Sequence, residues 1–141
     1  MVIFTGTLLN LDGVPDSQGD IFDENTAIEL PSHRVSVTLD FHKDPEFWLG
    51  TAKLFFRSNE LCYTMWLDDT RLPKYALETL TPCMAGSTKD IGRGHRKDVR
   101  ITSIGLFSIS NCDPRIKSIG EQNENNDDLD PNSTVVLRSG R

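Results

Sequence analysis

Hydrophobic and polar residues alternate most regularly between positions 35 and 41. Two valines, a leucine and a phenylalanine fall on one side of an extended chain, and Ser36, Thr38 and Asp40 fall on the other. A period of two residues is typical of a β-strand with one buried face. We expect a strand here whose polar face continues to His42, just before a Lys-Asp-Pro turn. An imidazole at the end of a strand suits acid–base chemistry, although a surface histidine without function gives the same pattern.

Further strands are predicted along most of the chain. Residues 2–9 are rich in β-forming residues, and the apolar segments 52–57 and 60–67 flank a two-residue turn, which predicts a hairpin. Residues 99–109 alternate again around an apolar centre that suits a strand deep in a sheet, and 116–119 are expected to continue the sheet. The number of strands predicts a β-dominated α+β domain.

Two other elements are expected between the strands. Residues 71–80 predict a helix, for which Asp68 offers an N-cap and Pro82 an end. Residues 83–94 are small and rich in glycine, which predicts a loop. The segment 23–30 fits either a short helix or an extended arm.

The chain divides into two parts by composition. Residues 1–119 carry the apolar periodicity of a folded domain. From residue 120 the sequence is acidic and rich in asparagine, and a segment of that kind does not bury enough apolar surface to fold. We therefore expect a flexible acidic tail over 120–141.

Charge and composition exclude several classes of function. The net charge of −6 argues against general nucleic-acid binding, because phosphate contacts need a basic surface. The chain has neither an apolar run of about 18 residues nor the pattern of a signal peptide. Its three scattered cysteines fit a reducing compartment better than a disulfide scaffold. Zinc-ligand pairs, the EF-hand order and a Walker loop are all missing, so we expect no metal and no cofactor.

Two segments carry a family resemblance. Residues 11–22 read Leu-Asp-Gly-Val-Pro-Asp-Ser-Gln-Gly-Asp-Ile-Phe, and residues 39–52 contain Phe-His-Lys-Asp-Pro followed by Leu-Gly-Thr-Ala. Both resemble the N-terminal signatures of tailed-phage prohead proteases, in which a histidine before an Asp-Pro turn is catalytic. The resemblance gives His42 that role. It also implies a small antiparallel or mixed β-barrel with one or two flanking helices, as in the herpesvirus assemblins.

The same resemblance leaves two positions for a nucleophilic serine. Met-Ala-Gly-Ser-Thr-Lys-Asp-Ile-Gly at 84–92 is similar to the family's serine loop and makes Ser87 the matching residue. Thr-Ser-Ile-Gly-Leu-Phe at 102–107 is similar to another form of that motif and would make Ser103 the nucleophile. We rank Ser87 first, because residues 104–116 then match the family's closing segment.

A serine hydroxyl becomes a strong nucleophile only when a neighbouring base takes its proton, and a third group usually orients that base. The acid that the family places at the start of its closing segment has no counterpart here. Asp40 and Asp98 are the candidates to replace it.

The expected serine loop also offers donors for the negatively charged oxygen of the transition state. Backbone N–H groups of Gly86, Thr88 and Lys89 would form the oxyanion hole there.

We therefore expect a serine endopeptidase of phage capsid maturation that uses a His–Ser dyad or an incomplete triad. The resemblance implies scaffold and major capsid proteins as substrates and partners, and a location in the prohead within the host cytoplasm. It leaves self-association open and implies no contact with nucleic acid or membrane. The alternative is a catalytically inactive protein of the same fold that serves as a capsid, scaffold or host-interaction component, which the missing acid favours. An unrelated β-rich binding domain remains a third hypothesis.

Overall fold

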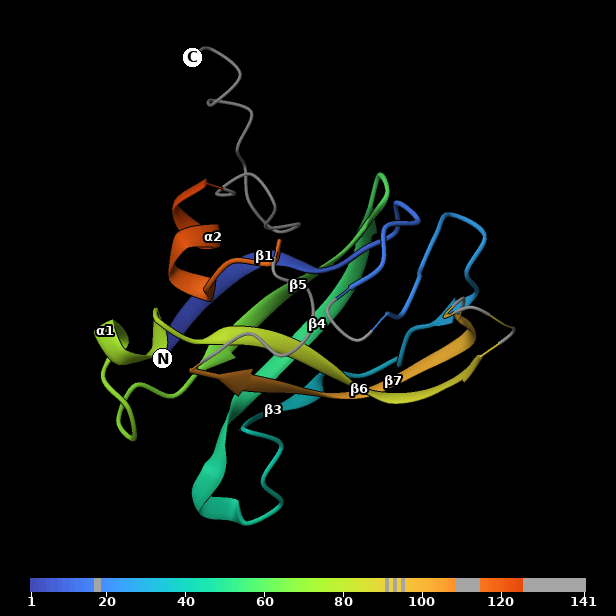
Figure 1. The fold of residues 1–141 in the computed structure, drawn as a ribbon. Coiled ribbons are helices and arrows are strands. Elements are labelled where there is room, and N and C mark those ends of the chain that lie inside the picture. Colours follow the sequence, from blue (N-terminus) through green and yellow to red (C-terminus); the bar gives the residue numbers. More distant parts are fainter. Residues whose placement is uncertain (17–18, 91, 93, 95, 109–114, 126–141) are drawn as a thin grey trace.

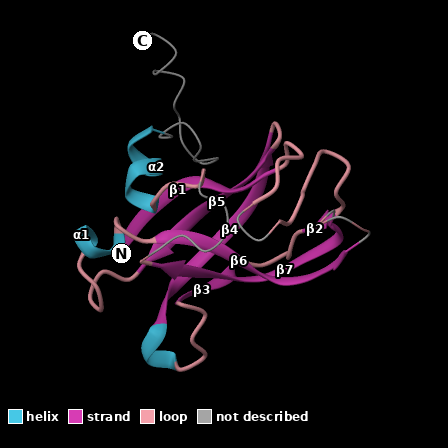
Figure 2. Ribbon diagram, viewed as in Figure 1, coloured by secondary structure: helices cyan, strands magenta, loops and turns pink. Residues whose placement is uncertain are grey.

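The computed structural model describes residues 1–16, 19–90, 92, 94, 96–108 and 115–125 (Figure 1). In chain order its elements are β1 (Val2–Asn10), β2 (Ile28–Glu29), β3 (Val35–Leu39), the 3-10 helix η1 (Pro45–Phe47), β4 (Trp48–Arg57), β5 (Glu60–Leu67), α1 (Lys74–Leu77), β6 (Thr81–Asp90), β7 (Arg96–Phe107) and α2 (Ile119–Asn125). Figure 2 shows that strands dominate and that the helices are short. None of the described helices is long and apolar enough to cross a membrane.

The strands form one mixed sheet that is open. Antiparallel ladders join β1 to β5, β5 to β4, β4 to β3 and β6 to β7, whereas β2 and β3 pair with β7 in parallel. Within the described residues no ladder joins β1 to β6, so the sheet does not close on itself. The expected closed barrel is therefore wrong, while the β-dominated domain with a mixed sheet and short helices is confirmed.

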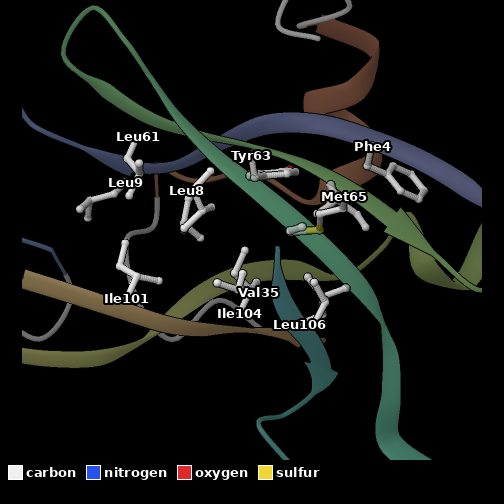
Figure 3. Close-up of a cluster of buried hydrophobic side chains, with 14 of the residues drawn as sticks. Phe4, Leu8, Leu9, Val35, Leu61, Tyr63, Met65, Ile101, Ile104 and Leu106 are labelled. Carbon is white, nitrogen blue, oxygen red and sulfur yellow. The ribbon is translucent and has the colours of Figure 1, made fainter. Parts of the chain in front are cut away.

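The sheet curls around a single hydrophobic core (Figure 3). Phe4 and Tyr63 from β1 and β5 face Ile104 and Leu106 from β7 across the enclosed space, and each is at most 1% exposed. Side chains that alternate with them point to the outer face of the sheet. The concave face therefore holds the hydrophobic core, whereas the outer face is buried at Thr5 and Thr64 of β1 and β5 and exposed at Ser36 of β3.

Helix α2 explains why the sheet stays open, because it covers the free edge of β1 (Figure 1). The N–H of Thr5 donates to Asn123 Oδ1 at 3.0 Å, and the N–H of Thr7 donates to Gln122 Oε1. Gly6 lies between them, and a Cβ at this position would collide with the side-chain amide of Gln122. The helix thus satisfies strand amides that another strand would otherwise pair with.

Several of the predicted strands are confirmed. The expected strand at 2–9 is β1, and the expected hairpin is β4–β5 with Arg57 opposite Glu60. The expected strand at 99–109 corresponds to β7, which begins at Arg96 and ends at Phe107, and residue 109 lies outside the described residues. Segment 23–30 is not a helix: residues 23–26 form a turn, in which the N–H of Thr26 donates to the carbonyl of Asp23 at 3.0 Å, and only the two residues of β2 form a strand.

The predicted helix at 71–80 is reduced to the four residues of α1. Asp68 does not cap it, because its carboxylate accepts hydrogen bonds from the N–H and hydroxyl of Thr70 and closes a turn instead. The helix starts after Pro73. Pro82 does not end a helix but lies in β6 opposite Leu106, which an outer strand of a sheet tolerates.

The predicted loop at 83–94 is wrong for residues 83–90, which belong to β6. Pairing with β7 along almost its whole length overrides the local preference of these small residues for a loop. Gly86 is needed for this pairing, because a Cβ there would collide with the carbonyl of Arg100.

The expected boundary at residue 120 falls inside α2. The residues before it, 116–119, lead into this helix rather than extending the sheet, and Ile116 and Ile119 are buried. The first residues of the expected tail are therefore part of the domain, and 126–141 lie outside the described residues.

The cysteines depart in part from expectation. Cys62 is a buried free thiol, whereas Cys83 is disulfide-bonded. The expectation of reduced cysteines alone is therefore wrong for Cys83.

Candidate functional site

A surface pocket of about 870 Å³ gathers residues from β3, β6, β7 and the loop 40–47. His42 lines it from the loop, Ser87 from β6 and Ser103 from β7. The structure therefore brings the predicted base and both candidate nucleophiles to one surface, although they are far apart in the sequence.

The hydroxyl groups of this pocket stand on the outer face of the sheet. In β3, Val35 and Val37 are buried while Ser36 between them is exposed, as the alternation predicts. Ser36 pairs with Ser103 of β7, and Ser103 in turn pairs with Ala85 of β6. Three neighbouring strands thus contribute one row of small, mostly polar side chains to the floor of the pocket.

A bulge in β7 shapes this floor. The register with β6 shifts between Ala85 and Gly86, which are opposite Ser103 and Ile101, so Thr102 is the extra residue. Both Thr102 and Ser103 line the pocket, and the hydroxyl of Thr102 donates to the carbonyl of Ala85 at 3.3 Å. Bulges re-aim side chains in this way and are common beside active sites.

The strand that leads to His42 ends earlier than expected. β3 stops at Leu39, and Asp40 and Phe41 have φ angles of 52° and 60°. The N–H of His42 donates to the carbonyl of Leu39 at 3.0 Å, which completes a type I′ turn. The expected strand through residue 41, with Phe41 in the core, is therefore wrong.

Phe41 lies over the outer face of β7. A Cβ on Gly105 would come within 2.7 Å of its ring, and the ring packs edge-on against Phe107 with 5.2 Å between centroids. A bulky residue with positive φ is strained, at a cost of order 1–3 kcal/mol. Packing on a glycine and a second aromatic ring compensates for that strain and fixes the start of the His42 loop.

The imidazole of His42 stacks on Phe47 of η1, with 4.3 Å between ring centroids and 27° between planes. Among the described residues, the side chains of His42, Ser87 and Ser103 have no hydrogen-bond partner. The base is thus held by a ring contact, and neither serine is bonded to it. Catalytic hydrogen bonds are often long or absent in ligand-free sites.

Strand register separates the two serines. Leu39, where the His42 turn begins, pairs with Leu106 of β7. Ser103 lies three residues earlier on that strand, at about 10 Å, whereas Ser87 pairs with Arg100, about 20 Å along β7 from Leu106 and one strand further from β3. Ser103 is therefore the serine closer to the turn that carries the imidazole.

The expected acids are not at the imidazole. Asp40 lies in the turn and is exposed, and Asp98 lines a neighbouring pocket with Ser87, away from the loop. Asp44, which none of the motifs singles out, does line the main pocket together with His42. Its signal was the Lys-Asp-Pro turn, whose aspartate lies two residues after the histidine.

The expected oxyanion loop is not formed. Gly86, Thr88 and Lys89 belong to β6, and the hydroxyl of Thr88 donates to the carbonyl of Lys97 on β7 at 3.0 Å. Successive N–H groups of an extended strand point to opposite edges, so they do not converge on one oxygen. The assignment of these three residues as a backbone nest is therefore wrong.

No group of three or more His, Cys, Asp and Glu side chains that could hold a metal occurs in the part of the chain that the structure describes. No protein-family model matches the chain, and no curated protein and no solved structure matches it either.

Proposed function

We propose that this protein is a serine endopeptidase of the prohead-protease type, in which His42 activates Ser103. The observation that carries the proposal is the shared pocket of His42 and the two serines that the motifs suggest. Strand register favours Ser103, which reverses the ranking made from the motifs. The Thr-Ser-Ile-Gly-Leu-Phe sequence around Ser103 agrees with this choice.

In the proposed reaction, the imidazole of His42 takes the proton of the Ser103 hydroxyl as its oxygen attacks the scissile carbonyl. The imidazolium then gives that proton to the leaving amine, and water hydrolyses the acyl-enzyme. The Ser36 hydroxyl, next to Ser103 in the register and in the same pocket, is the proposed side-chain donor for the developing oxyanion. Asp44 is the acid best placed to hold the imidazolium, since it lines the same pocket.

The reaction requires His42 to leave its stack on Phe47 and approach Ser103. A substrate that fills the pocket would supply the energy for this change, because closure of a loop over a site is a common consequence of binding. The scaffold and capsid-protein segments of a phage prohead are the proposed substrates, and this part rests on the family resemblance.

A fluorophosphonate probe tests the proposal without a known substrate, because it labels only activated serines. We expect the probe to add to Ser103, as mapped by mass spectrometry, and labelling to be lost in Ser103→Ala and His42→Ala. Ser87→Ala is the matched control and keeps its labelling. Adduct formation at Ser87 would reverse the choice of nucleophile.

The second candidate is an inactive protein of this fold that binds capsid or scaffold components. The observation in its favour is that His42 is bonded neither to a serine nor to an acid among the described residues. Absence of labelling at every serine in a folded sample, verified by circular dichroism, would select this candidate.

A further inference from the structure

A second surface pocket, of about 600 Å³, adjoins the His42 pocket along the seam of β3 and β7. The two pockets share Ser36 and Thr102 in their linings. They are therefore parts of one groove, which leads from the His42 loop past Ser103 toward the start of β3.

The far end of this groove is lined by Arg34, Arg100 and His33, together with Glu29. Arg100 Nη2 contacts Glu29 at 3.0 Å, but both side chains are about two-thirds exposed. An exposed ion pair of this kind is worth only about 0–1 kcal/mol, so a ligand carboxylate can compete for the guanidinium.

Arg34 is positioned but unpaired. Its guanidinium lies 3.7 Å from the centre of the Trp66 ring, and none of the described acids or carbonyls accepts a hydrogen bond from it. Stacking on an aromatic face holds the plane of a guanidinium and leaves its N–H edge available to a carboxylate. The groove thus ends at a preorganised donor that lacks an acceptor.

We propose that this groove binds an extended peptide and that Arg34, assisted by Arg100, holds an acidic side chain of that peptide. The proposal rests on the proposed function, since it names the substrate of the same site. Arg100 lies three residues from Ser103 on β7, at about 10 Å, which corresponds to about three residues of an extended peptide. The acid therefore lies about three residues from the scissile bond.

The charge of the groove favours a peptide over a nucleic acid. Glu29 lies among its basic residues, and the whole chain carries a net charge of −6. Nucleic-acid binding draws its affinity from several phosphate contacts, whereas one carboxylate needs a single guanidinium fork.

The test uses isotopically labelled Ser103→Ala protein, which cannot cleave, and NMR titration with two peptides. The probes are the acetylated and amidated decapeptides Ala-Ala-Val-Asp-Ala-Ala-Val-Ser-Ala-Ala and its Asn counterpart. We expect the Asp peptide to bind at least fivefold more tightly, with chemical-shift changes at Arg34 and Ser36, and the difference to shrink in 0.5 M salt.

Arg34→Ala on this background is expected to remove the preference for Asp and to leave the affinity for the Asn peptide unchanged. Arg57→Ala is the matched control, because Arg57 is an exposed arginine at the β4–β5 turn, outside the groove. Equal affinities for both peptides, or an equal loss in Arg57→Ala, would overturn the proposal. Tighter binding of a ten-nucleotide oligothymidine than of the Asp peptide would do so too.

The two proposals fail separately. Fluorophosphonate labelling of Ser103 without an Asp preference would leave the protease and remove the acidic subsite. An Asp preference without labelling of any serine would leave the peptide groove on a protein that is not a protease.

Discussion

Polar groups at the free edge of β1 and polar groups on the outer face of β3 and β7 differ in whether they are hydrogen-bonded. At β1, the N–H groups of Thr5 and Thr7 are bonded to α2, and Gln122, which bonds one of them, is only 5% exposed. At β3–β7, the hydroxyls of Ser36 and Ser103 face a pocket and have no partner among the described residues. The strand amides at the β1 edge are thus bonded within the fold, whereas the hydroxyls that line the β3–β7 pocket are not bonded to any described residue.

The difference predicts how each region responds to substitution. Loss of a buried, bonded group leaves its partner without water and costs stability. Loss of an exposed hydroxyl leaves nothing unsatisfied, so its effect on stability is small and its effect on binding or catalysis is not.

The largest effect on stability is expected at the edge of β1 that α2 covers. Gly6→Ala would place a Cβ 2.6 Å from the hydroxyl of Tyr63 and against the amide of Gln122. We expect the free energy of unfolding to fall by about 2–3 kcal/mol, because overpacking forces both buried groups to move. Urea unfolding monitored by tryptophan fluorescence measures the loss.

The matched control is the double variant Gly6→Ala with Gln122→Ala. Truncation of Gln122 makes room for the new methyl group. The loss of unfolding free energy in the double variant should therefore be smaller than the sum of the losses in Gly6→Ala and Gln122→Ala alone. Additive effects would show that Gly6 and Gln122 do not act as one unit. Labelling of Ser103 by fluorophosphonate should persist in both variants while they remain folded.

A smaller effect on stability, with a larger effect on Ser103 labelling, is expected on the outer face of β3 and β7. Gly105→Ala would push its Cβ to 2.7 Å from the Phe41 ring and displace the turn before His42. We expect a loss of about 1–2 kcal/mol in the free energy of unfolding and a fall of about tenfold in the rate of Ser103 labelling. Adding Phe41→Ala should relieve the clash, and failure to recover any stability would contradict the packing argument.

Sequence pattern predicts the strands well where one face is buried. The alternation of Val35, Ser36 and Val37 follows the contrast between the core and the outer face directly. The β4–β5 hairpin follows instead from two apolar segments that flank a two-residue turn. It fails at β6, since the glycine and small residues of this strand have no local preference for extension. Only the ladder with β7 makes them a strand.

The candidate site was partly predictable for the same reason. Motifs identify His42 and both serines, but the choice of Ser103 over Ser87 depends on the registers of β3 and β6 with β7, which no local pattern encodes. The alternation also predicts Phe41 on the apolar face of the strand, together with Val35 and Val37. The positive φ angles of the Asp40–Phe41 turn reverse its direction, and its packing on Gly105 is a contact between distant segments.

A third prediction concerns the stability of the β1–β5 region at high pH. Burial, reinforced by the nearby Glu60 carboxylate, raises the pKa of the Cys62 thiol to about 11, from 9.0 when it is exposed. The folded state therefore resists ionisation of this thiol. Its contribution to stability is complete below pH 9 and is lost as the pH rises from 9 toward 11, with a decrease of about 1 kcal/mol at pH 10.

Urea unfolding at pH 7 and pH 10 measures this decrease, and Cys62→Ala should reduce it. Burial also raises the pKa of Tyr63, so part of the alkaline loss should remain in the variant. A thiol reagent should not modify Cys62 in the native protein at pH 8. Rapid modification there would show that the β1–β5 region is open to water, which would remove the contrast with the β3–β7 face.

The smallest expected change in stability distinguishes two exposed carboxylate–arginine pairs, Asp12–Arg115 and Glu29–Arg100. Asp12, two residues after β1, accepts hydrogen bonds from Arg115, and this guanidinium holds the pKa of the Asp12 carboxyl below its usual range. Because the pKa is lowered, the stabilisation is present above pH 4 and is lost as the pH falls further. Asp12→Asn should lower the free energy of unfolding by about 0.5 kcal/mol at pH 7, and by less at pH 2.5, since the pair is exposed.

Glu29→Gln makes the same chemical change in the groove, where Glu29 contacts Arg100. No measurable change in the free energy of unfolding is expected, but the Asp peptide should bind about twofold more tightly because a competing carboxylate is gone. A pair that stabilises the fold and a pair that competes with a ligand are thus distinguished by which measurement responds. If Glu29→Gln destabilised the protein and left peptide binding unchanged, the Glu29–Arg100 pair would stabilise the fold, as the contacts at the β1 edge do. The proposed difference between the two regions would then be wrong.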